Sequence, residues 1–139
     1  MDADLKRENL KEALLRAMEG DAPMQWGKDD CALWCANILK AALGYDAAIL
    51  FRGRYDCPEG AQRVLGDGGL PRAIRNAARQ HGWRRAAPGK ECVGDIALMR
   101  SGGSVSTVIC RAPGWFVGRS AAGWMAVPTR LVKPIWAVA

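Results

Sequence analysis

The hydrophobic pattern of this chain changes its period once, at Gly82, and that change constrains the fold more than any other feature. Before Gly82, apolar residues recur at spacings of three and four, which predicts amphipathic helices. After it, short apolar runs alternate with turn sequences such as SGGS and APG, which predicts strands joined by tight turns. A run of helices followed by an antiparallel meander indicates the α+β fold class.

We expect four helices, three of which end at a glycine (Gly20, Gly44 or Gly82). Their expected ranges are Leu5–Glu19, Asp30–Leu43, Glu59–Leu65 after Pro58, and Leu70–Gln80. The second is the most apolar, so we expect it to be the central, buried helix. The expected strands are Asp95–Arg100, Val105–Arg111, Trp115–Arg119, Trp124–Val127 and Ile135–Val138.

The length favours a single domain over residues 1–139. Half of the residues are hydrophobic and 24% are charged, as in soluble globular proteins. No internal repeat or long linker divides the chain. We expect an N-terminal amphipathic helix within residues 1–20 and the rest of the domain within residues 26–138.

Cysteine and histidine counts limit the possible chemistry. There are five cysteines, an odd number, and one histidine, His81. The N-terminal residues contain no secretory segment, and no stretch approaches the roughly 20 apolar residues of a membrane span. We therefore expect free thiols in a reducing bacterial cytoplasm and no membrane span. With one histidine and no second cysteine pair at zinc-site spacing, we expect no metal and no cofactor.

The net charge of +6 favours contact with anionic partners. Arg72, Arg75 and Arg79 share one helical face, which predicts a solvated surface and leaves open a surface for nucleic acid or another anionic polymer. No motif that reads DNA or RNA accompanies them, so a nucleic-acid partner is not expected.

The most informative segment is WGKDDCALWCANIL. It places Cys31 in the first turn of the apolar helix, after Asp30, which we expect to cap that helix. Free amides and the helix dipole at such a position lower the pKa of a thiol, as a nucleophilic cysteine requires. Cys35 lies one turn deeper and is expected to be a small buried residue, as are Cys57, Cys92 and Cys110.

The Gly27-x-Asp29-Asp30-Cys31 sequence, together with GDIALMRSGGSVSTVIC, resembles the NlpC-type cell-wall cysteine peptidases. This resemblance implies a papain-like α+β fold in which Cys31 is the nucleophile at the start of the central helix. It also implies that the Gly94–Leu98 segment begins the sheet. The next strand would carry the catalytic histidine, and the strand after it a polar group that orients this histidine.

A narrower resemblance adds the segment FRGRYDCPEGAQRVLGDGGLPRAI and extends from Trp26 to Trp136. It is to a small NlpC-like domain family of unassigned function, found in the tail-gene modules of phages, prophages and gene transfer agents. It implies tail and tail-tip proteins as partners and assembly of the cytoplasmic product into a virion tail.

The sequence departs from the peptidase pattern at the histidine. On our alignment Thr107 occupies that position, and threonine cannot act as a general base near neutral pH. The Trp115–Arg119 strand offers no orienting amide or acid. His81 is expected at a helix end, where the helix dipole favours a cation. Asp95 could approach the site, although an ionised carboxylate donates a proton poorly.

Several other residues are candidates for binding. Trp26 precedes the thiol and is expected to wall a cleft. Arg54 and Tyr55, with Arg52, match the RGRY segment of the narrower family; we expect them to position a loop over the cleft, or to bind a peptide carboxylate. The remaining tryptophans are expected to pack in the core and on the sheet: Trp34, Trp83, Trp115, Trp124 and Trp136.

Three functions therefore stand open. The first, which we favour, is a catalytically impaired NlpC-like domain (a pseudoenzyme) that serves as a structural part of a phage-type tail, near the tip. The second is an active cysteine endopeptidase that cleaves peptidoglycan stem peptides with Cys31. The third is a basic module that binds an anionic polymer.

Overall fold

A computed structural model describes residues 1–20 and 22–139 and has the α+β class expected from the sequence. Its helices lie close to the predicted ranges: α1 (Ala3–Met18), α2 (Cys31–Leu43), α3 (Pro58–Leu65) and α4 (Gly69–His81). Capping explains these limits. Asp2 caps α1 and Asp30 caps α2, while Gly44 and Gly82 end α2 and α4 in the left-handed conformation. None of the described helices is both long and apolar enough to cross a membrane.

The strands form one antiparallel sheet of six, in the order β1-β6-β2-β3-β4-β5. They are β1 (Arg84–Ala86), β2 (Ile96–Ser101), β3 (Ser104–Ala112), β4 (Trp115–Ser120), β5 (Gly123–Pro128) and β6 (Val132–Ala137), with a short 3-10 helix, η1 (Thr129–Leu131), before β6. Gly102 and Gly103 both have positive φ and close the two-residue turn between β2 and β3.

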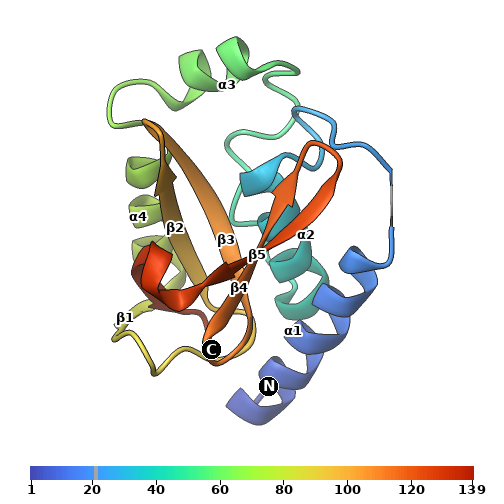
Figure 1. Ribbon diagram of the computed structural model, residues 1–139, viewed down its shortest axis with the longest axis vertical. Coiled ribbons are helices and arrows are strands. Elements are labelled where there is room, and N and C mark those ends of the chain that lie inside the picture. Colours follow the sequence, from blue (N-terminus) through green and yellow to red (C-terminus); the bar gives the residue numbers. More distant parts are fainter. Residues whose placement is uncertain (21) are drawn as a thin grey trace.

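The helices α1, α2 and α4 cover one face of the sheet (Figure 1). Leu10 and Leu14 of α1, Ile38 of α2 and Ala77 of α4 belong to one buried cluster with Ile109 of β3. As expected, α2 is the central helix, since seven of its 13 residues are buried.

The opposite face of the sheet is covered by the sheet itself. A second buried cluster contains residues from five strands and none from the helices: Ala97, Val108, Cys110, Phe116, Val127, Val132 and Ile135. Three strands separate β6 from β5 in the sheet, yet both contribute to this cluster. The sheet therefore curls and brings β5 and β6 toward each other (Figure 1).

Two expectations were wrong. The strand β1 was not predicted, because its sequence, Arg-Arg-Ala, has no alternating pattern; it is defined by pairing with β6. The side chains of Trp115 and Trp124 were expected to pack, yet they are 52% and 39% exposed. Neither side chain belongs to a buried cluster of the described residues, and β5, which carries Trp124, is an edge strand of the sheet. Trp34, Trp83 and Trp136 are buried as expected.

The sheet opens on one side of β3. Strand β3 pairs with β2 from Ser104 onward, but it pairs with β4 only from Ile109 onward. The β2–β3 and β4–β5 hairpins diverge beyond that point, and the N-terminus of α2 lies between them (Figure 1). This divergence places the first residue of α2 beside the unpaired half of β3.

Candidate functional site

Asp30 fixes the start of α2. Its side chain is 2% exposed and accepts hydrogen bonds from the backbone N–H of Leu33 (3.3 Å), the backbone N–H of Gly27 (2.9 Å) and the hydroxyl of Tyr55 (2.8 Å). The first bond is the predicted helix cap. The other two tie the preceding loop and the Tyr55 loop to the same carboxylate, so Asp30 organises the surroundings of Cys31.

Cys31 is the first residue of α2 and is partly buried. The expectation of a lowered thiol pKa was wrong, because the pKa of Cys31 is raised from its ordinary value of 9.0. Burial is the largest cause, and the negative charge of Asp30 adds to it. Hydrogen bonds from the backbone of Thr107 and Ala32 and from the Ser106 hydroxyl act in the opposite direction without reversing the shift.

The alignment placed the family's histidine position on Thr107, but Ser106 is the β3 side chain that interacts with Cys31. Successive side chains of a strand point to opposite sides. The side chain of Thr107 is 1% exposed and lies with Cys35 in the lining of a separate pocket. The thiol of Cys35 points to the backbone carbonyl of Thr107, with 3.8 Å between sulfur and oxygen.

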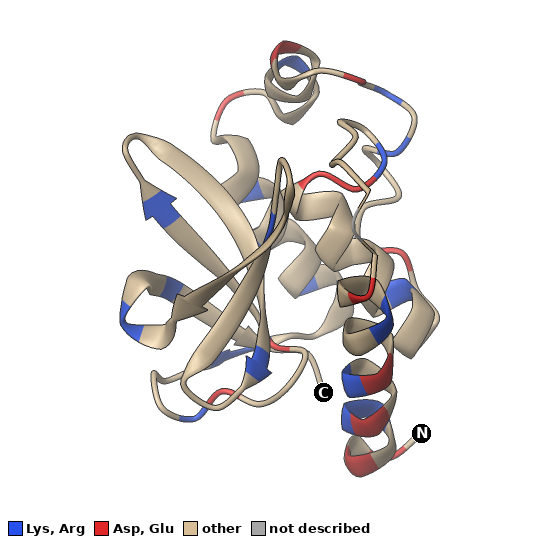
Figure 2. Cartoon of the chain, turned by 45° about the vertical axis from the view of Figure 1, so that its right-hand side comes forward, with Lys and Arg blue, Asp and Glu red and all other residues tan. Residues whose placement is uncertain are grey.

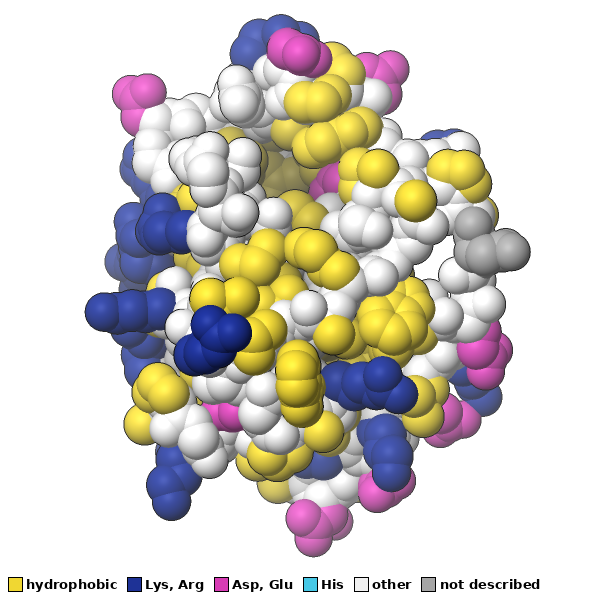
Figure 3. Space-filling view, in the orientation of Figure 1, with side chains coloured by type: hydrophobic (Ala, Val, Ile, Leu, Met, Phe, Trp, Pro, Cys, Tyr) yellow, Lys and Arg dark blue, Asp and Glu magenta, His cyan; other side chains and the backbone are white. Residues whose placement is uncertain are grey.

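Cys31 lies in a groove of about 740 Å³, here called the Cys31 groove. Figure 3 shows a hollow beneath α3 whose walls are largely hydrophobic. Trp26, Tyr55 and Leu65 are among its apolar lining residues, and Ser104, Val105 and Ser106 of β3 line it with them. The predicted residues Trp26, Asp30, Cys31 and Tyr55 therefore share one site.

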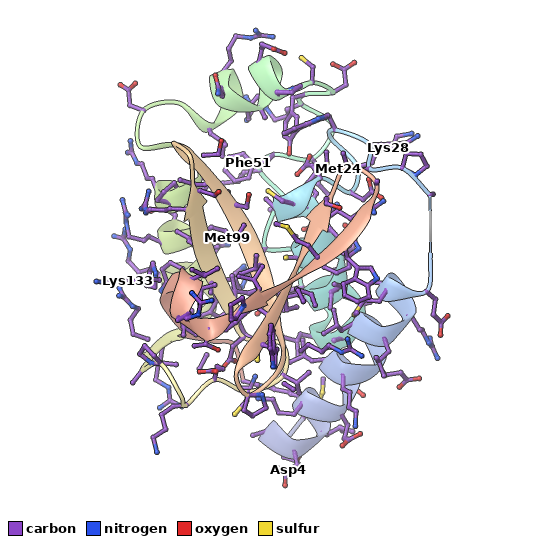
Figure 4. All side chains as sticks on the ribbon, viewed as in Figure 1. Asp4, Met24, Lys28, Phe51, Met99 and Lys133 are labelled. Carbon is purple, nitrogen blue, oxygen red and sulfur yellow. The ribbon has the colours of Figure 1, made fainter. Side chains whose placement is uncertain are left out.

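The loop that carries Trp26 is held against the β4–β5 hairpin. Arg119 of β4 donates to the carbonyl of Ala22 (2.6 Å) and forms an ion pair with Asp29 (3.3 Å). The backbone N–H of Met24 donates to the carbonyl of Ala121 (3.1 Å), and Met24 lies near the tip of this hairpin (Figure 4). These contacts fix the wall that Trp26 was expected to form, and Trp26 remains 37% exposed.

The two arginines of the RGRY segment make contacts close to them in sequence. Arg52 forms an ion pair with Asp46, and the exposed Arg54 donates to the carbonyl of Leu50 (3.1 Å). Arg54 does not line the groove, whereas Tyr55 does. Phe51, at the start of this segment, lies below α3 (Figure 4) and packs with Leu33 and Ala36 of α2.

Asp95 is not near the thiol. It is 1% exposed, pairs with Arg7 of α1 (2.6 Å) and accepts from the backbone N–H groups of Cys92 (2.9 Å) and Val138 (3.3 Å). Its backbone carbonyl bonds to Cys110, which is four residues along β3 from Ser106, or about 13 Å at the rise of a strand. Asp95 therefore joins the first helix to the C-terminal residues.

His81 is also remote from Cys31. Its ring stacks on Tyr45, with 4.1 Å between ring centroids, just beyond the C-terminal end of α2. Cys31 is at the other end of this helix, about 18 Å away at 1.5 Å per residue. The only imidazole of the chain therefore does not reach the thiol in this structure.

The other cysteines divide into three kinds of environment. Cys35 and Cys110 are buried as predicted. Cys57 is only partly buried, contrary to expectation, because it is the cap at the start of α3, where it accepts from the backbone N–H of Gly60. Cys92 is exposed, which contradicts the expectation of burial, because it lies in the loop before β2. Within residues 1–20 and 22–139, no three His, Cys, Asp or Glu side chains gather as a metal site would require.

With the geometry of the groove established, comparison with known proteins adds one finding. The model of a family described as a domain of unknown function (DUF6950) matches residues 5–138. The chain belongs to this family. No curated protein matches the chain. The family match covers all of the elements that build the groove in this DUF6950 domain, from α2 to β3.

Among the residues of the DUF6950 groove that sequence reasoning missed are Ser106, Leu65 and Leu70. The apolar positions of the two short helices predicted a buried face, but not that this face would line a groove. Ser106 was missed because the sequence comparison singled out Thr107, the next residue of the strand. The alternation of β3 was the available signal, since it places Ser106 and Thr107 on different sides.

Hydrolysis by a cysteine nucleophile needs a base beside the thiol, and the described residues around Cys31 supply none. A cysteine nucleophile normally has a base within hydrogen-bonding reach. The groups that interact with Cys31 here are backbone amides, the Ser106 hydroxyl and the charge of Asp30. Asp30 already accepts three hydrogen bonds. Among the described residues, none therefore combines contact with Cys31 and a free basic atom.

Proposed function

We propose that this chain is a catalytically impaired, papain-like NlpC-type domain that acts as a structural component of a phage-type tail, near its tip. In this proposal the Cys31 groove holds a segment of another tail protein and does not cleave it. The tail location and the tail-protein partners rest on the resemblance of WGKDDCALWCANIL, the RGRY segment and GDIALM to tail-module domains.

One observation carries the loss of catalysis. The thiol at the first position of α2 has a raised pKa, chiefly because it is buried, and the β3 side chain beside it is Ser106. A serine hydroxyl cannot accept the proton of a thiol near neutral pH. A nucleophile without its base loses most of its rate, because the two act as a unit.

The arrangement of the elements is consistent with the NlpC-type fold that the resemblance implies. A cysteine begins the central helix α2, and the Gly94-Asp95 sequence leads into β2. Strand β3, which would carry the histidine of an active enzyme, lies beside the N-terminus of α2. These features support the proposal of a peptidase-like cleft that lacks its base.

A digestion experiment tests the proposal. Purified muropeptides with intact stem peptides are incubated with the protein at high concentration and analysed by mass spectrometry. We expect no stem-peptide fragments with the wild-type chain, and therefore no difference between it and Cys31→Ala. Stem-peptide fragments that form with the wild type and vanish with Cys31→Ala would overturn the proposal.

A second experiment tests the assembly role in the particle whose tail module encodes the chain. We expect deletion of the gene to block tail assembly, and Cys31→Ala to restore assembly and infection together. If the Cys31→Ala particle assembles normally but fails to infect, with host peptidoglycan uncut, the structural role is contradicted.

The position of Cys31 favours the enzyme as the second candidate. A cysteine at the start of a helix, in an open groove and near a hydroxyl, is placed as a nucleophile would be. Under this alternative the protein is a cysteine endopeptidase that acts on peptidoglycan peptides. The digestion experiment separates the two, since only the enzyme gives products that depend on Cys31.

A further inference from the structure

The unpaired half of β3 presents free backbone groups to the Cys31 groove. Ser101 and Ser104 are the closing pair of the two-residue turn, so they bond to each other across it. Along β3, the backbone N–H and C=O groups of successive residues point alternately toward β2 and away from it. Those of Val105 and Thr107 therefore point away from β2. Cys31 and Cys35 interact with the backbone of Thr107. Within residues 1–20 and 22–139, the corresponding groups of Val105 have no strand partner.

A small pocket adjoins the groove at this place. It has a volume of about 60 Å³ and shares Ala32, Tyr55, Leu65 and Leu70 with the lining of the groove. The remaining lining is almost entirely apolar and comes mainly from α2, α4 and the loop after α2. A cavity of about 150 Å³ accepts benzene, so this pocket has room for about two or three heavy atoms.

Thr107 gives this pocket, here called the Thr107 pocket, one polar group. The side chain is 1% exposed, and its Oγ1 atom is buried without a hydrogen-bond partner among residues 1–20 and 22–139. A buried hydroxyl without a partner is costly, because it has lost its hydrogen bonds to water. An occupant that offers both an apolar surface and one hydrogen-bonding atom would remove this cost.

The charge of the groove restricts its occupant. The chain carries a net charge of +6, and Figure 2 shows its charged residues mainly on the helices, loops and strand ends. Asp30 is the one charged residue in the described lining of the groove, and its carboxylate already accepts three hydrogen bonds. The occupant is therefore an uncharged segment, and an anionic polymer does not fit this surface.

We propose that the groove binds an uncharged, extended segment of a partner protein, which adds as a strand to β3 at Val105 and inserts a threonine or serine side chain into the Thr107 pocket. Main-chain hydrogen bonds to Val105 supply binding, and the pocket supplies sequence preference, as in other cases of strand addition. This inference rests on the proposed function, because it identifies the kind of segment that the inactive groove holds.

Synthetic heptapeptides test the inference. The probe is Ser-Val-Ser-Thr-Ser-Val-Ser, compared with peptides in which valine or glutamate replaces the central threonine. Binding to the full chain is measured by titration of backbone amide NMR signals. We expect the threonine peptide to bind about tenfold more tightly than its valine isostere, as one hydrogen bond to a buried partner predicts. We also expect slower hydrogen exchange at the Val105 amide.

Two variants of the protein test whether the Thr107 hydroxyl and the Val105 backbone account for the binding of the peptides. Thr107→Val keeps the shape of the side chain and removes the hydroxyl, so we expect it to remove the preference for threonine over valine. Val105→Pro removes one edge donor, so we expect it to weaken all the peptides alike. Amide spectra of the free variants establish that each is folded. If Thr107→Val unfolds the protein, Thr107→Ser replaces it and is expected to retain the preference.

The outcomes separate this inference from the function on which it rests. Strand addition would be overturned by equal binding of the three peptides, by no binding, or by unchanged hydrogen exchange at the Val105 amide. The proposed function would still stand in each case if Cys31 cleaves no muropeptide. A crystal structure in which only a water molecule bonds to Thr107 with peptide present would also overturn the inference. Cleavage of the peptide that depends on Cys31 would instead contradict the proposed function.

Discussion

At the scale of single residues, the site is determined by which side chain of β3 faces the thiol. The difference between Ser106 and Thr107 is one position in the sequence, yet one interacts with Cys31 and the other lines the adjoining pocket. The helix start that was expected to activate the thiol also buries it beside Asp30. The result is a cysteine at the start of the central helix whose pKa is raised, chiefly by burial.

Asp30→Asn tests the contribution of the neighbouring charge. Asparagine is also a good helix cap, so α2 keeps its start. Removing the negative charge is expected to lower the pKa of Cys31 toward its ordinary value, because that charge disfavours the thiolate. The measurement is the pH dependence of Cys31 alkylation. Asp56→Asn, at an exposed position in the nearby loop, is the control and is expected to leave the pH dependence of Cys31 alkylation unchanged. An unchanged Cys31 profile in Asp30→Asn would contradict this account.

At the scale of elements, the loops that hold the groove depend on close contacts that sequence patterns do not reveal. Gly27 has a φ of +83°, and a Cβ atom at this position would lie 2.1 Å from the carbonyl oxygen of Tyr55. The Trp26 loop and the Tyr55 loop therefore touch through a glycine. This contact and the shared Asp30 carboxylate set the distance between two walls of the groove.

Gly27→Ala is expected to destabilise the protein by about 2–3 kcal/mol, because it adds a clash to the strain of a positive φ. Gly53→Ala is the matched control. Gly53 has a φ of +72° and open space around it, so only the strain applies. Urea denaturation measures both variants. Equal losses of unfolding free energy would show that the contact between the loops has no energetic role.

Glu91 joins three loops around the far end of the sheet. Its carboxylate accepts from Gly89 (2.7 Å), Gly114 (2.7 Å) and the hydroxyl of Thr129 (2.7 Å). Burial acts to raise its pKa, but these hydrogen bonds outweigh burial, and the pKa lies below its ordinary value of 4.5. A lowered folded-state pKa stabilises the fold above the unfolded pKa, and this contribution is lost as the pH falls through the folded value.

Wild-type unfolding free energy is therefore expected to fall as the pH drops below about 4.5, and Glu91→Gln is expected to flatten this dependence. The measurement is denaturant unfolding at several acidic pH values. Glu12→Gln removes an exposed ion pair on α1 and serves as the control. Its unfolding free energy is expected to depend on pH as that of the wild type does. The same pH slope in wild type and Glu91→Gln would refute the role given to this carboxylate.

At the scale of the whole molecule, the two ends of the chain meet at Arg7. Its guanidinium pairs with Asp95 (2.6 Å) and donates to the carbonyls of Val93 (2.8 Å) and Ala139 (3.2 Å). One side chain of α1 therefore contacts both the segment that precedes β2 and residue 139. Asp95 was proposed from sequence as a groove residue, and this contact gives it a structural role.

Arg7→Met is expected to cost about 3 kcal/mol of unfolding free energy, because it leaves the buried carboxylate of Asp95 without its cation. Arg16→Met is the comparison, since the pair of Arg16 with Glu12 is exposed and is expected to contribute less than about 1 kcal/mol. Thermal and urea denaturation measure both. A loss for Arg7→Met no larger than that for Arg16→Met would contradict the importance of this pair.

The α+β class and the cysteine at the start of the central helix could be predicted because local periodicity and capping determine them. The curl of the sheet and the strand β1 could not, since both depend on pairing between distant residues. The same limit applies to the site. Trp26, Asp30, Cys31 and Tyr55 are close to one another in sequence or in the matched motif, whereas Ser106 and the Thr107 pocket depend on the register of β3.

The central claim is that the thiol at the start of α2 is not activated for catalysis. The most direct measurement is the rate at which iodoacetamide alkylates Cys31 in the folded wild-type chain between about pH 5 and 10, followed for this residue by peptide mass spectrometry. Only the thiolate reacts. We predict a low rate at neutral pH that continues to rise beyond pH 9.0, the ordinary thiol value. A fast rate that already reaches a plateau below about pH 7 would contradict the account, because it is the behaviour of an activated cysteine.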